Sequence, residues 1–275
     1  MNTPTVVICI DGLDPDYLEV CETPNLDEMA RKGFLVLGLS MMPSVTNVNN
    51  VSLVTGRYPS EHGIASNYLR SSETGGGQYM ESADYVRAES LFERAASLGK
   101  RSLLVTSKDK LRTLLGRGAT ISVSSEKAPD WVTAAVGAPP EIYSLEVNGW
   151  AIRAATFIAS REPADVIYVS TTDYAMHTFA PDEPESQRHM TILDGAIGDL
   201  VAAMPEAAVL ITADHGMSAK TRMVDVAGEL ERKGIAAEAV PIIKDRYTVH
   251  HSNLGGCTNV YLRNGEVDEA AKVLR

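Results

Sequence analysis

The stretch Thr5–Gly12, TVVICIDG, decides the fold that we expect for this chain of 275 residues. Its first six residues are rich in Val and Ile, which is typical of a strand buried on both faces of a parallel sheet. Asp11 follows this run at once, and Gly12 permits a tight turn after it. The stretch therefore predicts a central strand whose carboxyl end carries a carboxylate.

The same kind of run recurs along the chain and alternates with helical patterns. Further predicted strands are Ser102–Thr106, Val166–Ser170 and Val209–Thr212. The predicted helices between strands include Pro24–Lys32, Glu89–Leu98 and Glu185–Met204. This alternation predicts the α/β class, with a doubly wound, mostly parallel sheet and helices on both faces. We assign residues 1–256 to this core, and residues 257–275 to the first strand and helix of an incomplete small α/β cap unit.

The composition is that of a globular protein, with 44% hydrophobic and 22% charged residues. With 36 acidic and 25 basic side chains, the net charge of −11 argues against a nucleic acid or an anionic membrane as partner. The three widely spaced cysteines predict no disulfide framework, and the N-terminus lacks the features of a signal peptide. We therefore expect a cytoplasmic protein that acts on a small molecule; a homodimer is left open.

Three of the predicted strands are followed by acidic residues. Asp11, Asp173 and Asp214 should meet at one edge of the sheet, because the carboxyl ends of parallel strands do. Carboxylates this close repel one another unless they share a cation. His177 lies four residues after Asp173, on the same face of a helix or turn, and His215 follows Asp214. Carboxylate and imidazole ligands together suit zinc, with manganese or iron as alternatives. Each carboxylate could instead cap the helix that follows it.

A second polar segment contains a candidate nucleophile. Pro43–Asn50, PSVTNVNN, precedes the apolar run Val51–Val54 and is predicted to be a loop that leads into a helix. Thr46 would there meet helix-end N–H groups that can bind an anion, and a metal could deprotonate its hydroxyl. The alternative is that Thr46 only caps the helix.

Taken in order, these motifs resemble the alkaline phosphatase superfamily. The motifs are Asp11-Gly12, P-S-x-T-N at Pro43–Asn47, G-x-x-P-x-x-H-G-I at Gly56–Ile64, D-x-x-x-H at Asp173–His177 and D-H-G-M at Asp214–Met217. Within the nucleotide pyrophosphatase/phosphodiesterase-like branch, nearly the whole chain is similar to the phosphonoacetate hydrolase family. The segments that carry this similarity are PSVTNVNN, VTSKDKLRTLLG, YVSTTDYAMH, ITADHGMSAK and YTVHHSNLGG. The resemblance implies an alkaline phosphatase-like fold and cleavage of the P–C bond of phosphonoacetate to acetate and phosphate.

The resemblance also implies a di-zinc site with a threonine nucleophile. The implied ligands are Asp11, Thr46, Asp214 and His215 for one zinc, and Asp173, His177 and one further histidine for the other. Thr46 would attack phosphorus and form a phosphothreonine, which water would then hydrolyse. Asn67 would donate a hydrogen bond to a phosphoryl oxygen, and Lys108 and Lys110 would bind the carboxylate of the substrate. From the residues alone, the two lysines could equally belong to a solvated basic turn.

The sequence departs from the family at its C-terminal end. The last zinc ligand of the family is a histidine in a Gly-rich segment beyond a second small α/β unit, and this chain stops before it. We therefore expect a truncated form, in which His250 and His251 line the substrate pocket or substitute for the ligand. His62 is expected to orient its own loop, and His189 is expected on the surface.

Two other functions fit the same residues. One is a phosphodiesterase or nucleotide pyrophosphatase of the same superfamily, in which Lys108 and Lys110 have no substrate carboxylate to bind. The other is an inactive, metal-binding truncated form, which the missing histidine suggests.

Overall fold

The computed structural model describes residues 3–71, 75–246 and 255–275. The chain divides into two compact units, Met1–Ala65 with Met80–Ser218 and Ser66–Tyr79 with Ala219–Arg275. Among the described residues, no helix has both the length and the apolar character needed to cross a membrane. The first unit contains the α/β core that the sequence predicts.

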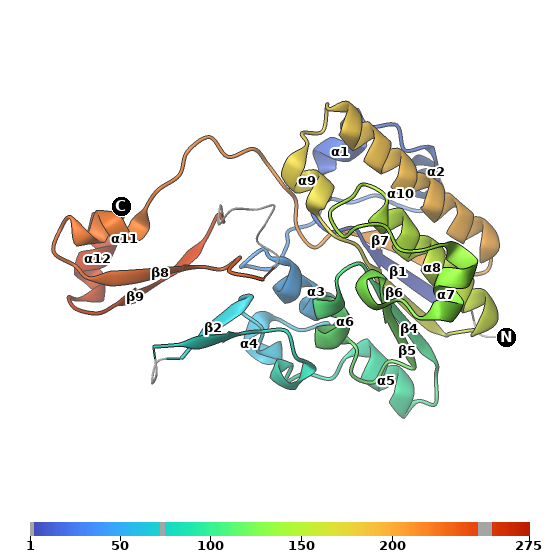
Figure 1. Ribbon diagram of the computed structural model, residues 1–275, viewed down its shortest axis with the longest axis horizontal. Helices are drawn as coiled ribbons and strands as arrows, with labels where there is room; N and C mark the ends of the chain where they lie inside the picture. Colours follow the sequence, from blue (N-terminus) through green and yellow to red (C-terminus); the bar gives the residue numbers. More distant parts are fainter. Residues whose placement is uncertain (1–2, 72–74, 247–254) are drawn as a thin grey trace. The chain divides into compact units, whose positions relative to one another are not determined.

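A sheet of five parallel strands forms the centre of the first unit (Figure 1), in the order β5-β4-β6-β1-β7. These strands are β1 (Thr5–Cys9), β4 (Ser102–Thr106), β5 (Ile121–Ser124), β6 (Val166–Ser170) and β7 (Ala208–Thr212). The register pairs Cys9 with both Ser170 and Thr212, and it pairs Thr106 with Ser170. The carboxyl ends of these four strands are therefore level, and the residues that follow them emerge at one edge of the sheet.

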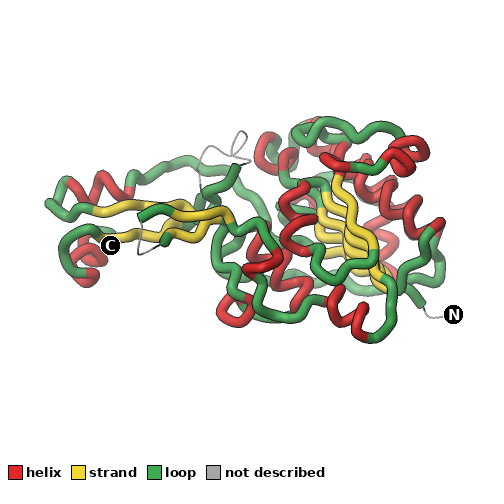
Figure 2. The backbone as a smooth tube through the Cα atoms, turned by 60° about the horizontal axis from the view of Figure 1, so that its bottom comes forward, coloured by secondary structure: helices red, strands yellow, loops and turns green. Residues whose placement is uncertain are grey.

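Helices cover both faces of this sheet (Figure 2). The helices of the first unit are α1 (Pro15–Val20), α2 (Pro24–Lys32), α3 (Thr46–Thr55), α4 (Pro59–His62), α5 (Leu91–Ser97), α6 (Asp109–Leu115), α7 (Asp130–Val136), α8 (Val147–Arg161), α9 (Tyr174–Thr178) and α10 (Pro184–Ala203). Helix α8 packs on β4 and β6 and contacts α7 and α10, whereas α3 contacts α5 and α6. The predicted fold class, a mostly parallel sheet between helices, is confirmed.

The segment before the buried helix α3 differs from the prediction. Pro43–Asn50 was expected to be a loop, but α3 begins at Thr46 and so includes the last five residues of that segment. Four polar residues of this helix, Thr46, Asn47, Asn49 and Asn50, are buried, and Asn47 and Asn50 form hydrogen bonds to distant parts of the chain. The helix ends at Gly56, whose φ of +61° is the left-handed conformation that glycine adopts readily.

In its described residues, the second unit has two antiparallel pairs of strands and two helices. Its elements are β2 (Tyr68–Arg70), β3 (Gly77–Tyr79), α11 (Val226–Glu231), β8 (Ala237–Pro241), β9 (Thr258–Leu262) and α12 (Val267–Val273). This unit begins earlier in the chain than residue 257, where the sequence led us to place a cap unit, because β9 pairs with β8. Ala270 on the apolar face of α12 is buried with Leu230 and Ile235, so part of that face is covered.

Candidate metal and nucleophile site

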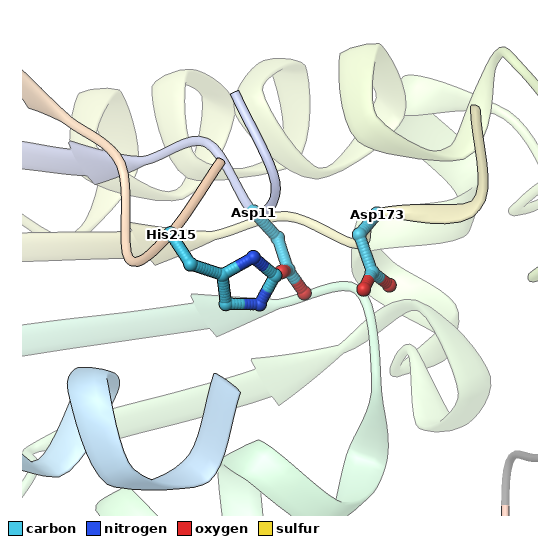
Figure 3. A group of neighbouring side chains, drawn as sticks. All are labelled: Asp11, Asp173 and His215. Atoms are coloured by element: carbon cyan, nitrogen blue, oxygen red, sulfur yellow. The ribbon is translucent and has the colours of Figure 1, made fainter. Parts of the chain in front are cut away.

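The level strand ends bring three ionisable side chains together that are far apart in the sequence. Asp11 follows β1, Asp173 follows β6 and His215 follows β7, and one possible ligand atom from each lies within 4.8 Å of the others. Figure 3 shows the carboxylates of Asp11 and Asp173 and the imidazole of His215 side by side. Gly12 permits this approach, because its φ is +76° and a Cβ there would lie 3.0 Å from the Cβ of Asp173.

Asp11 is at the centre of this cluster and is fully buried. Burial raises the pKa of its carboxyl well above its ordinary value, and the negative charges of Asp173 and Asp214 raise it further. The ammonium of Lys108 acts in the opposite direction, since its Nζ lies 3.9 Å from Oδ2 of Asp11. A cation bound between the carboxylates would relieve this repulsion.

Asp214 is held by donors on both sides of its carboxylate. Oδ1 accepts hydrogen bonds from the backbone N–H groups of Gly12, at 3.1 Å, and His215, at 2.9 Å. Oδ2 accepts a hydrogen bond from Nδ2 of Asn50 at 3.3 Å. Asn50 was quoted in the sequence motif without a role, although it lies four residues after Thr46 and hence on the same face of α3.

The hydrogen bond of His215 fixes which of its ring nitrogens can bind a metal. Nδ1 lies 3.1 Å from the carbonyl oxygen of Gly216, which can only accept, so Nδ1 carries the proton. Nε2 is then the ring nitrogen that can bind a metal ion, and it lies 3.5 Å from Oδ1 of Asp11 and 3.6 Å from Oδ2 of Asp214. A ring nitrogen that faces carboxylate oxygens while the other is hydrogen-bonded is the arrangement expected around a metal ion.

Thr46 is the first residue of α3 and does not cap it, since Val45 is the N-cap residue. Its hydroxyl is buried and donates to Asp11, at 3.3 Å from Oδ1 and 3.4 Å from Oδ2. The interpretation of Thr46 as a helix cap is therefore wrong. The candidate nucleophile lies beside the carboxylate that is shared by the cluster.

Asp173 connects the cluster to two further charged or titratable side chains. Its Oδ2 lies 2.9 Å from Nε2 of His177, one turn later along α9, as the spacing predicts. Its Oδ1 accepts a hydrogen bond from Nζ of Lys108 at 2.9 Å. Lys108 and Lys110 are 3% and 7% exposed, so the alternative of a solvated basic turn is wrong.

The remaining residues predicted for the site are Asn67, His250 and His251. Asn67 belongs to the second unit, where its Nδ2 donates to Oδ2 of Asp245 at 3.0 Å. His250 and His251 lie outside the described residues.

The structure also locates the two other histidines. His62 orients its loop as expected, because Nδ1 accepts a hydrogen bond from the backbone N–H of Ile64 and Nε2 lies 2.9 Å from Oγ of Ser52. His189 is not on the surface as predicted: it is 1% exposed, and its Nδ1 donates to the carbonyl oxygen of Leu145.

The donor set of the cluster fits a divalent metal ion. Carboxylate oxygens from Asp11 and Asp173 and an imidazole nitrogen from His215 converge, and Asp214 and Thr46 contact the same cluster. Three carboxylates outnumber the ammonium of Lys108, so the site attracts positive charge. Mixed oxygen and nitrogen ligands suit zinc and, less specifically, manganese or iron.

Comparison with known proteins agrees with this geometry. The family model for type I phosphodiesterase / nucleotide pyrophosphatase matches residues 5–275. The crystal structure of phosphonoacetate hydrolase from Sinorhizobium meliloti 1021 in complex with phosphonoacetate is similar, with a TM-score of 0.90 and 32% identity. That similarity covers 98% of this chain and 71% of the other.

Two curated relatives are more distant. Bis(5'-adenosyl)-triphosphatase enpp4 from Mus musculus is 23% identical over 94% of this chain, and venom phosphodiesterase from Naja atra is 22% identical over 79%. The chain spans 59% of the first and 26% of the second. The match along nearly the whole chain and the likeness to the hydrolase structure place this protein in the type I phosphodiesterase / nucleotide pyrophosphatase family, with an alkaline phosphatase-like α/β fold.

Proposed function

We propose that this protein is a metal-dependent hydrolase that cleaves the P–C bond of phosphonoacetate to give acetate and phosphate. The observation that carries the proposal is the burial of two lysines, Lys108 and Lys110, at the start of α6. Buried ammonium groups are costly unless they meet negative charge, and the ammonium of Lys108 contacts the cluster that contains Thr46 and Asp11. The similarity to phosphonoacetate hydrolase supports the same substrate.

The metal in this proposal is zinc, with two ions in the complete ligand set. Asp11, Thr46, Asp214 and His215 would hold one ion; Asp173, His177 and a further ligand would hold the other. His250 and His251 are candidates for that ligand or for the wall of the substrate pocket. When bound, the metal would lower the pKa of the Thr46 hydroxyl and offset negative charge on the phosphonate.

Thr46 acts as the nucleophile in this proposal. Its hydroxyl loses its proton to water, and Oγ forms a bond to phosphorus while the P–C bond breaks and the bonding electron pair leaves with the CH2 carbon. That pair is delocalised into the neighbouring carboxylate as an enediolate, which takes up a proton from water and becomes acetate. Water then attacks the phosphothreonine, so that phosphate leaves and the hydroxyl of Thr46 is restored.

The lysines act on the leaving group. Negative charge on the carboxylate of the substrate grows as the P–C bond breaks, so ammonium groups beside it stabilise the transition state more than the ground state. Lys108 and Lys110 would bind this carboxylate. Asn67 stays predicted to donate a hydrogen bond to a phosphoryl oxygen; within the second unit its amide donates to Asp245.

A second candidate function is hydrolysis of a nucleotide phosphodiester or pyrophosphate. The family that the chain belongs to and its curated relatives favour it. In that reaction the leaving group is an alkoxide or a phosphate, so the two lysines have no carboxylate to stabilise.

The two functions are distinguished by assaying zinc-loaded protein against phosphonoacetate and bis(4-nitrophenyl) phosphate. Phosphonoacetate hydrolysis predicts equal amounts of phosphate and acetate, with a higher kcat/KM than for the diester. A higher kcat/KM for the diester, without release of acetate, would favour the second function.

A further inference from the structure

One buried side chain joins the two turns that carry Asp173 and Lys108. Asn148, near the start of α8, is 1% exposed. Its Oδ1 accepts hydrogen bonds from the backbone N–H of Thr172, at 2.8 Å, and from the hydroxyl of Ser107, at 2.9 Å. Its Nδ2 donates to the carbonyl oxygen of Thr172 at 2.7 Å.

The partners of Asn148 directly precede site residues. Thr172 precedes Asp173 after β6, and Ser107 precedes Lys108 after β4. The carboxylate of Asp173 and the ammonium of Lys108 then meet at 2.9 Å. The amide of Asn148 thus stands between two neighbouring strand ends and is bonded to both.

We propose that Asn148 is a positioning residue that fixes the distance between the metal ligand Asp173 and the substrate-binding Lys108. The proposal rests on the proposed function, because it takes Asp173 as a ligand and Lys108 as a contact of the substrate. The side chain itself touches neither the metal nor the substrate. It acts through the backbone of Thr172 and the hydroxyl of Ser107.

The chemistry of the amide explains why asparagine suits this position. An asparagine side chain offers an acceptor and a donor side by side. The acceptor binds the backbone N–H of Thr172, and the donor binds its carbonyl oxygen. Aspartate keeps the acceptor but places a second oxygen against the carbonyl of Thr172. Helix α8 packs closely on α10 beside Asn148, since a Cβ on Gly149 would lie 2.5 Å from Cγ2 of Ile192.

The two partners of Asn148 allow its effects on metal and substrate to be separated. Loss of the amide releases both turns, so Asn148→Ala should weaken zinc binding about 10- to 100-fold, as for other residues that support metal ligands. The KM for phosphonoacetate should rise in the same variant. Ser107→Ala releases only the Lys108 turn, so it should raise KM severalfold and leave zinc affinity within about twofold.

A matched control lies at the opposite end of the same strand. Ser102 begins β4, is 1% exposed, and its hydroxyl accepts a hydrogen bond from the backbone N–H of Thr120. Ser102→Ala removes a buried serine hydroxyl, as Ser107→Ala does, but far from the strand ends. It should lower Tm and leave zinc affinity and KM unchanged.

The experiment measures Tm, zinc affinity by chelator competition, and KM and kcat for phosphonoacetate in the three variants. The proposal predicts the pattern above, with zinc affinity in Asn148→Asp between that of wild type and Asn148→Ala. Wild-type zinc affinity in folded Asn148→Ala would overturn the proposal. If the alanine variant does not fold, wild-type zinc affinity in Asn148→Asp would overturn it instead. If the wild type does not hydrolyse phosphonoacetate, the proposed function fails, whereas zinc affinity still tests the role of Asn148.

Discussion

Two buried aspartates in the same unit, Asp194 and Asp11, have very different surroundings. Asp194, in α10, accepts hydrogen bonds from the backbone N–H groups of Asn25, at 3.1 Å, and Leu26, at 2.9 Å. Both donors belong to the first turn of α2, where a carboxylate is stabilised by the helix dipole. Asp11 instead faces Asp173 and Asp214, and its pKa is raised well above its ordinary value by burial and by those charges.

Asp194 is thus a carboxylate that stabilises the fold, whereas Asp11 is one that can bind a cation at the candidate site. Asp194 is satisfied by N–H donors and joins α10 to α2. Asp11 repels its neighbours until a cation binds, so it contributes to chemistry at the expense of stability. The following predictions test this contrast, from the largest expected effect to the smallest.

Substitution Thr46→Ala should reduce kcat for phosphonoacetate by about 10³-fold or more, because the proposed nucleophile is lost. The zinc content should stay close to that of wild type, since the carboxylate and imidazole ligands remain. Thr46→Ser, which keeps a hydroxyl, serves as the control and should retain part of the activity. Wild-type turnover in Thr46→Ala would show that Thr46 is not the nucleophile.

Substitution Lys110→Ala should lower kcat/KM for phosphonoacetate by about 10²-fold, a value typical for loss of one group that stabilises transition-state charge. The rate on bis(4-nitrophenyl) phosphate should change little, because that substrate has no carboxylate. Lys110 is preferable to Lys108 here, because Lys108 also pairs with Asp173. Equal losses on both substrates would contradict a role in binding the carboxylate.

Replacing each of the two aspartates by asparagine should change the free energy of unfolding in opposite directions. In metal-free protein at pH 7, Asp11→Asn should increase the free energy of unfolding by about 0.5 to 2 kcal/mol, the usual size of a stabilising substitution, because a buried carboxyl that faces two other carboxylates is replaced by a neutral amide. Asp194→Asn should decrease it by about 1 to 3 kcal/mol, because hydrogen bonds to a charged group are weakened. Urea denaturation measures both values. A loss of stability in Asp11→Asn would contradict the account of that site.

His189 should make a smaller, pH-dependent contribution. Burial lowers the pKa of its imidazole below the ordinary value of about 6.5, so below that pH the unfolded chain binds a proton that the native state does not. Stability is therefore lost as the pH falls below about 6.5, by at most about 1.4 kcal/mol per pH unit from this group.

The measurement compares urea midpoints at pH 7.5 and 5.5 for metal-free wild type and His189→Gln. The variant should lose less stability on acidification than wild type, because it has no imidazole to protonate. An equal loss in both proteins would assign the acid sensitivity to other groups.

The periodic patterns of the sequence predicted the sheet edge but not every buried polar residue. Asp11, Asp173 and Asp214 could be brought together from sequence, because parallel strands must end at one edge. Asn50 and Asn148 could not be given roles, since their partners Tyr168 and Thr172 are 118 and 24 residues away in the chain.

The same reasoning explains two of the departures from the predictions. Polar residues of Pro43–Asn50 and the imidazole of His189 suggest solvent exposure when only their neighbours in sequence are considered. In the structure Asn47 donates to the carbonyl oxygen of Met80, and His189 donates to that of Leu145. A buried polar residue depends on a partner from another element, and local periodicity carries no information about that partner.

The central claim is that the strand-end cluster is a metal site that drives hydrolysis of phosphonoacetate. The most direct test is a zinc count by elemental analysis and a phosphate-release assay on the same preparation, before and after chelation. The account predicts bound zinc, release of phosphate from phosphonoacetate, and loss of both on chelation with recovery when zinc is restored. Zinc-loaded protein that releases no phosphate, or equal release with and without the metal, would contradict it.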